Sequence, residues 1–393
     1  MKLSLLGSTG SIGCNTLQVV RELPERPEVV ALTAGRNVES LLEQALEFRP
    51  KLIALADEQA RRRFLDLFRG ASGTAGYTPD VLAGPAGNLA AAQNECDTLV
   101  SAAVGVAGMA ATFEAVRLGK RVALANKETL VAGGEIVMAE AKRSGAAILP
   151  VDSEHNAAHQ CLRAGRADEV DRLILTASGG PFRTTPREQL ERVTPEQALN
   201  HPTWKMGARI TIDSSTLMNK GFEVIEACHL FAFGPERVDV VVHPQSVVHA
   251  LVEYRDGSVI AQLGPPDMKL PIRYALSYPA RETGPADRRL SWNRVRHLDF
   301  EPPDPEKFPL LRLAYQTLEQ GGTAGCVLNA ADEIAVESFL QHEIPYVRIA
   351  SVVEETLERM GAERASTIEE TLAVDREARV VARELAAQHV ASV

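Results

Sequence analysis

Short apolar segments alternate with longer stretches of helical periodicity over the first 150 residues of the chain. Each apolar segment is flanked by glycine or polar residues, which is typical of strands buried on both faces of a parallel sheet. The expected strands are Lys2–Leu6, Val29–Ala34, Leu52–Ala56, Thr98–Ala102, Arg121–Ala125 and Ala146–Val151. This alternation predicts an α/β domain with a doubly wound, Rossmann-like parallel sheet over residues 1–150.

The pattern changes in the chain that follows. Strands expected at residues 170–177 and 238–242 precede a hairpin, formed by residues 247–254 and 258–263. This mixture predicts an α+β domain over residues 151–284, with a partly antiparallel sheet; the candidate site residues described below indicate a catalytic role for it. The hairpin leaves one strand edge open to pairing, so we expect the same domain to form a homodimer.

The last third of the chain predicts a linker and a helical region. Residues 285–309 are rich in proline and lack periodicity, which indicates a linker. Helical periodicity over residues 310–393 predicts a small C-terminal helical bundle. We expect Asp375 to cap the last helix of this bundle.

Composition narrows the class of protein. The net charge of −10 is spread along the chain, whereas a nucleic-acid-binding surface needs clustered basic residues. No apolar segment approaches the roughly 20 residues of a membrane span. The five cysteines (14, 96, 161, 228 and 326) form no C-x-x-C pair, as expected for reduced thiols. We therefore expect a cytoplasmic protein without signal peptide, nucleic-acid partner or membrane partner.

The first candidate site directly follows the first expected strand. The segment Gly7–Gly13, with sequence GSTGSIG, lies between that strand and a helix. Its glycines permit a tight turn and close approach to a pyrophosphate, and the helix start offers free N–H groups to an anion. The spacing G-x-x-G-x-x-G departs from the usual G-x-G-x-x-G, yet the strand–turn–helix context favours a dinucleotide site over a purely structural turn.

Two further positions suggest how a dinucleotide is held. The second strand ends in Gly35-Arg36-Asn37, where an NAD-binding fold usually carries an acid. The guanidinium of Arg36 favours the 2′-phosphate of NADPH, although a surface arginine is the alternative. Lys127, in Asn126-Lys127-Glu128 after the fifth strand, can contact substrate and nicotinamide or move a proton. A polar helix start explains the same residues without a ligand.

Three carboxylates are candidate metal ligands. Asp152 and Glu154 come directly after a buried strand, and in extended chain their side chains point the same way. Glu223 lies after serines, an amide and Lys220, and it can supply a third oxygen ligand. An oxygen-rich set suits Mg²⁺ or Mn²⁺ rather than zinc. A solvated Asp-Glu turn and a solvent-exposed salt bridge between Lys220 and Glu223 are the alternatives.

Two loops complete the candidate site. Ser178, followed by two glycines, leaves backbone N–H groups free to bind an anion. The loop Asn200–Gly207 has neither helical nor strand periodicity and carries His201 and Trp204, which predicts a lid that closes over a ligand. A tryptophan that anchors the loop by packing is an equally good explanation of Trp204.

Seven motifs, taken together, resemble one family, the 1-deoxy-D-xylulose 5-phosphate reductoisomerases of the non-mevalonate isoprenoid pathway. They are GSTGSIG from Gly7, ANKE from Ala125, PVDSEH from Pro150, SGGPF from Ser178, NHPTWKMG from Asn200, MNKGFE from Met218 and HPQS from His243. Any one of these motifs is weak, but their order along the chain is specific. The resemblance implies rearrangement of a ketose phosphate to a branched aldehyde, then reduction by NADPH to 2-C-methyl-D-erythritol 4-phosphate.

The resemblance also implies roles for individual residues. It implies that the residues active in catalysis are Lys127, Asp152, Glu154, His201 and Glu223, and that Asp152, Glu154 and Glu223 hold Mg²⁺ or Mn²⁺, with Co²⁺ as a third option. Substrate would contact Ser153, Ser178, His201, Trp204, Ser214, Asn219, Lys220 and Glu223, with a flap at about residues 198–208. NADPH would contact Thr9, Gly10, Ser11, Ile12, Gly35, Arg36, Asn37, Asn126, Lys127, Glu128, Gly207 and Met268. Small departures from the family are Lys205 after Trp204 and Ser215 in place of a common alanine.

Two rival functions stay open from the residues alone. One is a different NADP-dependent dehydrogenase, acting on a semialdehyde or a sugar phosphate without rearrangement. The other is a module that senses NADPH and binds a partner without catalysis. The dehydrogenase does not need three carboxylates around a metal, and the sensing module leaves the phosphate and metal residues without a role.

Overall fold

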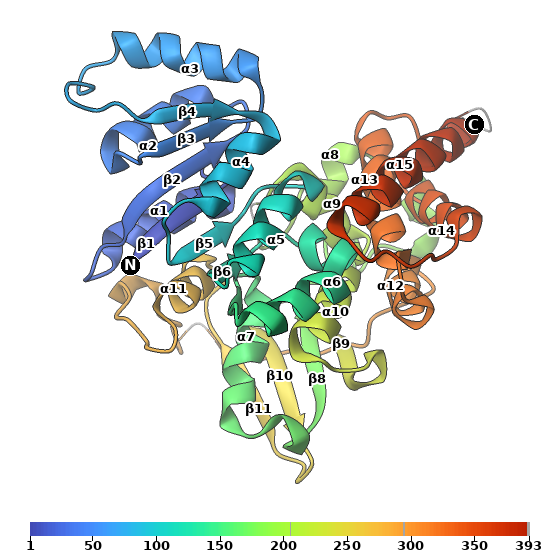
Figure 1. The fold of residues 1–393 in the computed structure, drawn as a ribbon. Helices are drawn as coiled ribbons and strands as arrows, with labels where there is room; N and C mark the ends of the chain where they lie inside the picture. Colours follow the sequence, from blue (N-terminus) through green and yellow to red (C-terminus); the bar gives the residue numbers. More distant parts are fainter. Residues whose placement is uncertain (205, 294, 391–393) are drawn as a thin grey trace. The chain divides into compact units, whose positions relative to one another are not determined.

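The computed structural model describes residues 1–204, 206–293 and 295–390 (Figure 1). The chain folds into two compact units. The first unit comprises Met1–Thr129, Val137–Asn156 and Asp267–Arg288. The second unit comprises Leu130–Ile136, Ala157–Pro266 and Arg289–Val393. The predicted domain boundaries at residues 150, 284 and 309 stay a prediction.

The first unit is built on a seven-stranded, all-parallel sheet of order β4-β3-β2-β1-β5-β6-β7. The strands are β1 (Lys2–Leu6), β2 (Glu28–Ala34), β3 (Leu52–Leu55), β4 (Asp80–Ala83), β5 (Thr98–Ser101), β6 (Arg121–Leu124) and β7 (Ile148–Pro150). The strand order changes direction between β1 and β5, and ligands of open α/β sheets bind at the carboxyl ends of strands beside such a point. The predicted Rossmann-like sheet is confirmed.

Sequence patterns missed one strand, β4. It lies at the edge of the sheet and pairs only with β3. Its sequence, DVLA, has an apolar run of only three residues, and its residues alternate between exposed and half-buried. A short edge strand needs little apolar surface, because only one neighbour covers it.

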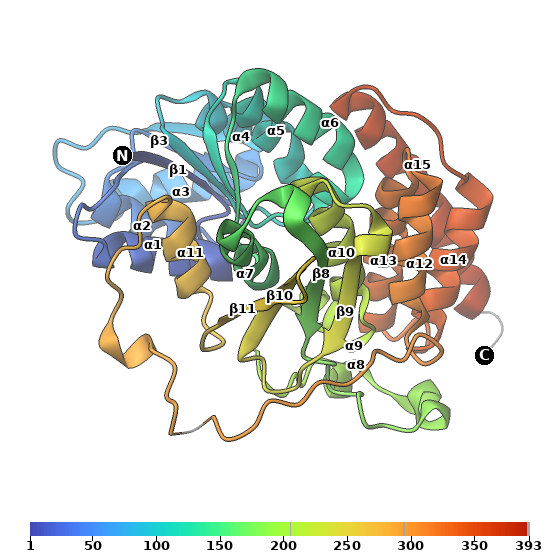
Figure 2. The ribbon, with the colours of Figure 1, turned by 90° about the horizontal axis from the view of Figure 1, so that it is seen from below.

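Helices cover both faces of this sheet. They are α1 (Ser11–Glu22), α2 (Val38–Phe48), α3 (Glu58–Gly70), α4 (Gly84–Gln93), α5 (Met109–Arg117), α6 (Glu128–Ser144) and α11 (Lys269–Ser277). Helices α1, α2 and α11 lie on one face, and α4 and α5 lie on the other (Figure 2). Leu3 and Val100 of the strands share one buried core with Leu17 of α1, Leu41 of α2 and Ile272 of α11.

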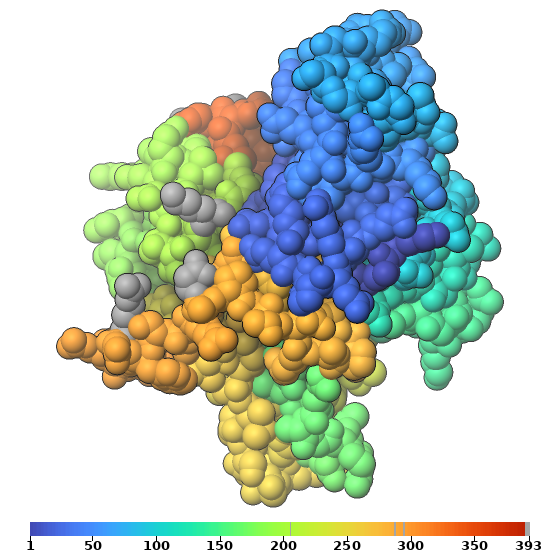
Figure 3. Space-filling view, turned by 90° about the vertical axis from the view of Figure 1, so that its left-hand side faces the viewer, coloured from blue at the N-terminus to red at the C-terminus, as the bar shows by residue number. Residues whose placement is uncertain are grey.

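The second unit contains a four-stranded mixed sheet of order β11-β10-β8-β9. Its strands are β8 (Val170–Ala177), β9 (Val238–Val242), β10 (Val248–Tyr254) and β11 (Val259–Leu263). β8 and β9 are parallel, while the other two pairs are antiparallel. The predicted hairpin is therefore confirmed. Its outer strand, β11, lies at the molecular surface (yellow in Figure 3), and Val259 is 48% exposed.

The helices from α7 onward, apart from α11, are α7 (Ser153–Cys161), α8 (Pro195–Ala198), α9 (Ala208–Ser215), α10 (Met218–Phe231), α12 (Pro309–Gln320), α13 (Ala324–Leu340), α14 (Arg348–Met360) and α15 (Ile368–Val390). We call α12 to α15 the C-terminal helical bundle. Leu328 and Ile349 of this bundle belong to the same buried core as Ile212 of α9, Phe222 of α10 and Leu175 of β8. The predicted bundle is thus continuous with the core behind the mixed sheet.

Asp375 does not cap the last helix, so that expectation is wrong. α15 begins seven residues earlier, at Ile368, where the hydroxyl of Thr367 accepts the backbone N–H of Glu370 at 3.1 Å. Asp375 lies inside α15 and is buried. Its oxygen accepts the side-chain Nε–H of Arg379 at 2.7 Å, and this pairing explains an acid at that position.

Within the part of the chain that the structure describes, none of the helices combines the length and the apolar character that a membrane span requires.

The shared core of the second unit predicts that the helical bundle and the mixed sheet stabilise each other. Leu328→Ala, at a fully buried position, should lower the free energy of unfolding by about 2–5 kcal/mol. Val380→Ala, in the same bundle but 53% exposed, should change it by less than about 0.5 kcal/mol. Urea unfolding followed by circular dichroism measures both values. Equal, small effects of the two substitutions would contradict the shared core.

Candidate active site

The glycine-rich turn after β1 is shaped by close backbone contacts. Gly7 has a φ of +77°, which glycine adopts without strain. A Cβ on Gly13 would lie 2.3 Å from the carbonyl oxygen of Gly7, so no larger residue fits there. Gly10 precedes α1 without a side-chain cap among the described residues. The first N–H groups of α1 are therefore available to an anion at the carboxyl end of β1.

Arg36 lies at the carboxyl end of β2, as the sequence predicts. Its side chain is 84% exposed, and its Nε lies 3.2 Å from Asp57 at the end of β3. The adjacent Asn37 caps α2, because its side chain accepts the N–H of Ser40 at 3.3 Å. The helix start thus fixes the backbone beside a guanidinium that solvent and ligands can reach.

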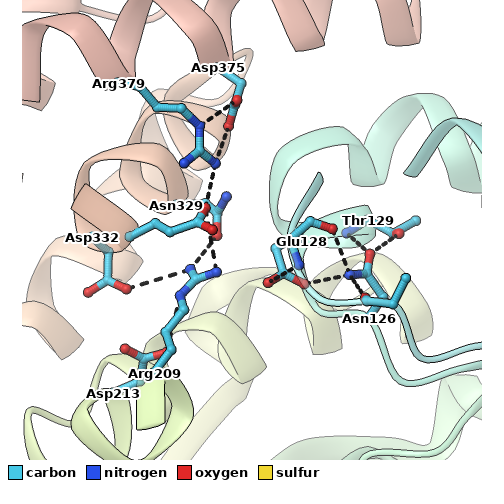
Figure 4. Close-up of polar contacts among 12 residues, drawn as sticks. Asn126, Glu128, Thr129, Arg209, Asp213, Asn329, Asp332, Asp375 and Arg379 are labelled. Carbon is cyan, nitrogen blue, oxygen red and sulfur yellow. Dashed lines mark hydrogen bonds and ion pairs between the residues drawn. The ribbon is translucent and has the colours of Figure 1, made fainter. Parts of the chain in front are cut away.

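Asn126 and Glu128 are both buried, and their side chains brace the loop after β5 (Figure 4). The amide of Asn126 donates to the carbonyl oxygens of Ala103 at 2.7 Å and Gly105 at 3.0 Å. The same amide donates to Glu128 at 2.6 Å, and Glu128 accepts the N–H of Gly105 at 3.1 Å. These bonds give both residues a structural role, which extends the polar helix start that the sequence offered as the alternative to a ligand site. Their role as cofactor contacts stays a prediction.

Lys127 and Asp152 form an ion pair at the carboxyl edge of the first unit's sheet. Asp152 does not lie in extended chain with Glu154, so that expectation is wrong. Asp152 instead caps α7, because its Oδ1 accepts the N–H groups of Glu154 at 3.1 Å and His155 at 3.4 Å. Glu154 consequently stands in the first turn of α7, and the hydroxyl of Ser153 donates to it at 3.0 Å.

Glu223 is fully buried in α10 of the second unit. Its carboxylate pairs with Lys220 one turn earlier and accepts the side-chain amide of Asn219 at 2.6 Å. Lys220 is buried as well, so the alternative of a solvent-exposed salt bridge is wrong. Burying an ion pair costs free energy that well-packed apolar residues would not, which indicates a functional reason for these residues.

Ser178 and Ser214 are brought together by the glycines that follow Ser178. Gly179 and Gly180 have φ values of +82° and +65°. A Cβ on Gly180 would lie 2.7 Å from the carbonyl oxygen of Ser214, so glycine lets the loop lie against the end of α9. The two predicted phosphate-binding serines are therefore neighbours in the second unit.

His201 connects the predicted flap to Ser178. Its Nδ1 accepts the backbone N–H groups of Thr203 at 3.1 Å and Trp204 at 2.9 Å. Nδ1 therefore carries no proton, and Nε2 donates to the hydroxyl of Ser178 at 2.9 Å. Burial lowers the pKa of His201 below its ordinary value, which keeps the ring neutral near pH 7. Lys205, the flap residue that departs from the family, lies outside the described residues.

Sequence reasoning assigned no role to two histidines that the structure places beside predicted site residues. His155 is buried, and its Nδ1 lies 3.7 Å from Asp152. His249 is buried in β10, with its ring 6.5 Å from that of Trp204. His155 stood inside the PVDSEH motif and was detectable there. His249 sits in an apolar strand, where a histidine resembles an ordinary core residue.

The remaining predicted residues divide between the two units. Met268 packs against the core of the first unit, beside α11. Gly207 immediately precedes α9 in the second unit and is exposed. The first unit thus carries the glycine turn, Arg36, the Lys127–Asp152 pair and Glu154. The second unit carries the two serines, the flap residues and the cluster of Asn219, Lys220 and Glu223.

The tautomer of His201 yields a prediction for the flap. In a Trp292→Phe background, which leaves Trp204 as the only tryptophan, emission should stay constant above pH 7. It should change as the pH falls below about 6.5, because a protonated Nδ1 cannot accept the Trp204 N–H. Since the folded pKa is depressed, the stabilising contact is present above the unfolded pKa and is lost as pH falls through the folded pKa. His201→Asn, whose side chain does not titrate, should abolish the transition; an unchanged transition in this variant would refute the assignment.

Models of one protein family match most of the chain. The model described as 1-deoxy-D-xylulose 5-phosphate reductoisomerase matches residues 3–134. Its C-terminal domain model matches residues 148–231, and a DXP reductoisomerase C-terminal domain model matches residues 263–381. The matches therefore span both units.

Full-length relatives carry the same name. The 1-deoxy-D-xylulose 5-phosphate reductoisomerase of Solibacter usitatus is 58% identical over 389 residues, which is 98% of this chain and 97% of that protein. The Chlorobaculum tepidum protein of the same name is 52% identical over 385 residues, covering 98% and 99%. Among solved structures, the Zymomonas mobilis 1-deoxy-D-xylulose 5-phosphate reductoisomerase in complex with NADPH has 43% sequence identity and a TM-score of 0.90. A DOX-P reductoisomerase in complex with NADPH, fosmidomycin and magnesium has 40% sequence identity and a TM-score of 0.92. Each of these two matches covers 98% of both chains. This chain belongs to the 1-deoxy-D-xylulose 5-phosphate reductoisomerase family.

Proposed function

We propose that the chain converts 1-deoxy-D-xylulose 5-phosphate into 2-C-methyl-D-erythritol 4-phosphate, using NADPH and a divalent metal ion. The observation that carries this function is full-length similarity to reductoisomerases, one of them solved with NADPH, fosmidomycin and magnesium. Both rival functions fail to account for that similarity. The enzyme is thus an oxidoreductase of isoprenoid precursor synthesis that rearranges its ketose phosphate substrate before reducing it.

The substrate phosphate is assigned to four side chains of the second unit. Lys220 supplies a cation, Ser178 and Ser214 supply hydroxyl groups, and Asn219 supplies an amide. The contact between Gly180 and the Ser214 carbonyl supports this assignment, since it brings both serines together. Holding the non-reacting phosphate lets binding energy orient the carbon centre.

The metal site is assigned to Asp152, Glu154 and Glu223. All three donors are carboxylate oxygens, which suit Mg²⁺, Mn²⁺ or Co²⁺. Burial of Glu223 beside Lys220 supports a site built for charge. A divalent ion bound there would polarise the carbonyl of the α-hydroxyketone and stabilise developing negative charge. Ser153 orients Glu154 through its hydroxyl and also contacts the substrate.

NADPH is assigned to the first unit's sheet edge. The pyrophosphate is held by the turn from Thr9 to Ile12, and the 2′-phosphate by Arg36 with Gly35 and Asn37. Lys127 lies with Asp152 at the carboxyl ends of β6 and β7, where it contacts the sugar and holds or moves a proton. The other assigned cofactor contacts are Asn126, Glu128, Gly207 and Met268.

The flap is assigned the role of excluding water. His201 ties it to Ser178, and Trp204 lies against the ring of His249. A flap held in this way covers the phosphate site and protects the aldehyde intermediate from solvent. His201 also contacts the substrate.

A homodimer is assigned to the open edge of β11. Val259 and Ile260 are exposed on this edge strand, and pairing with a second copy would cover them. A monomeric mass at micromolar concentration would contradict the dimer.

We also infer a cytoplasmic location, because the five free cysteines suit a reducing compartment.

The metal assignment predicts the behaviour of Glu223→Gln. This change keeps the size of the side chain but removes its charge, so kcat/KM should fall by at least about 100-fold at saturating Mg²⁺. Glu319→Gln, at an exposed glutamate of α12, should leave turnover unchanged. Loss of NADPH absorbance with 1-deoxy-D-xylulose 5-phosphate measures both. EDTA should stop the wild-type reaction; turnover that resists EDTA would favour a dehydrogenase without rearrangement.

The cofactor assignment predicts a change in preference between NADPH and NADH. Arg36→Gln should raise KM for NADPH about tenfold and leave KM for NADH nearly unchanged, because only NADPH carries the 2′-phosphate. Arg62→Gln, at an exposed arginine of α3, is the matched control. A parallel increase of both KM values in Arg36→Gln would count against the 2′-phosphate contact.

A further inference from the structure

Arg209, in the first turn of α9, stands at the centre of a charged cluster that no role assigned above uses (Figure 4). Its Nη2 donates to the side-chain oxygen of Asn329 at 2.8 Å. Its guanidinium also lies 3.7 Å from Asp332 and 3.6 Å from Glu333, which belong to α13 like Asn329. Asp213, one turn further along α9, lies 3.8 Å away. The cluster therefore connects α9 with the C-terminal helical bundle.

A second arginine extends the cluster to α15. Arg379 forms an ion pair with Glu333, and its Nε donates to Asp375 at 2.7 Å. Glu333 is thus shared between the arginine of α9 and the arginine of α15. Two guanidinium groups face four acids, Asp213, Asp332, Glu333 and Asp375, within one unit.

Packing helices through this cluster costs free energy, because it buries charged groups. Asp332 is fully buried, and neither of its carboxylate oxygens accepts a hydrogen bond from the described residues. Burial raises the pKa of Asp332 to about 6, while the nearby charge of Arg209 opposes the shift. Apolar residues of similar volume often pack such a site with equal or greater stability. The charges therefore indicate a requirement for orientation rather than for stability.

The C-terminal end of α9 also contacts the region of the C-terminal helical bundle. The hydroxyl of Tyr346, in the segment between α13 and α14, donates to the carbonyl oxygen of Ser215 at 2.6 Å. Tyr346 is buried and packs edge-on against Phe182. α9 has only eight residues, too few for a helix to be stable alone in water. Contacts from the helical bundle region therefore fix both of its ends.

α9 links two parts of the substrate site. It begins directly after the flap at Gly207, and it carries Ser214 in its last turn. The carbonyl of Ser214 lies against Gly180 of the other phosphate loop. A shift of α9 along its axis would move Ser214 relative to Ser178, and hydrogen bonds to phosphate weaken steeply when distance and angle change.

We propose that Arg209 is a positioning residue for the substrate phosphate, and that α13 holds it through Asn329, Asp332 and Glu333. Arg209 does not touch the substrate; it fixes the axial position of α9 and thereby the hydroxyl of Ser214. The C-terminal helical bundle is then part of the phosphate site rather than a separate structural appendage. The proposal rests on the assignment of Ser214 to the substrate phosphate.

The first test compares Arg209→Met with a matched ion-pair variant. Arg209→Met should raise KM for 1-deoxy-D-xylulose 5-phosphate about tenfold, change kcat by less than about threefold, and leave KM for NADPH unchanged. Arg172, which pairs with Glu253 and Asp239 on the mixed sheet, provides the control Arg172→Met. The control should lower the melting temperature without changing any KM. If Arg209→Met lowers the melting temperature and leaves KM unchanged, the residue is merely structural and the proposal is wrong.

A double-mutant cycle with Ser214 separates positioning from direct contact. Ser214→Ala should raise KM for the substrate in the wild-type background and raise it clearly less in the Arg209→Met background, because the hydroxyl is already misplaced there. Fully additive effects would overturn the proposal. If Ser214→Ala itself leaves KM unchanged, the phosphate assignment fails instead, so the two failures are distinguishable.

Conservative variants keep the proposal testable if Arg209→Met does not fold. Arg209→Lys retains the charge but loses the planar fork, and should give a smaller increase in KM. Tyr346→Phe removes only the bond to the Ser215 carbonyl and should raise KM for the substrate about threefold. Wild-type KM values in both variants would contradict the proposal.

Discussion

The packing of the second unit depends on a carboxylate that is buried together with a cation. Glu223 and Lys220 are both buried within one turn of α10, with Asn219 beside them. Charges in such a place need partners of fixed geometry, because an unpaired buried charge destabilises a protein strongly. The rest of the unit keeps α10 and its neighbour α9 in place. Ile212 of α9 and Phe222 of α10 share one core with the mixed sheet and the C-terminal helical bundle.

The first unit, in contrast, presents backbone N–H groups and cations at the carboxyl edge of a parallel sheet. The turn between β1 and α1 does so through the close approach that Gly13 allows. Arg36 and Lys127 add side-chain cations at the ends of β2 and β6, each paired with an acid that follows a neighbouring strand. Asn126 and Glu128 stiffen the loop after β5. Polar side chains that the sequence suggests as ligand contacts, such as Asn126 and Glu128, therefore also stabilise the backbone beside the predicted site.

The sequence predicts the strands other than β4 and the family of the chain well, because both depend on patterns and motifs that follow directly from the order of residues. Strands such as β1 (KLSLL) and β8 (VDRLILTA) are rich in apolar residues, and motifs such as PVDSEH place acids directly after a strand. It predicts short strands and helix ends poorly: β4 has an apolar run of only three residues, and Asp375 looks like a helix cap although Thr367 performs that role. The cluster around Arg209 joins residues more than 100 positions apart, so no local pattern reveals it. The capping of α7 by Asp152 depends on where that helix begins, which the apolar pattern does not specify.

The central proposal is that carboxylates distant in the sequence, Asp152 and Glu154 together with Glu223, bind one divalent ion. Electron paramagnetic resonance of Mn²⁺, titrated into the full-length protein with NADPH present, measures this binding directly. The account predicts one ion per chain, with affinity reduced at least about tenfold by either Asp152→Asn or Glu223→Gln, since each removes a charged ligand. Wild-type affinity in either variant would contradict it.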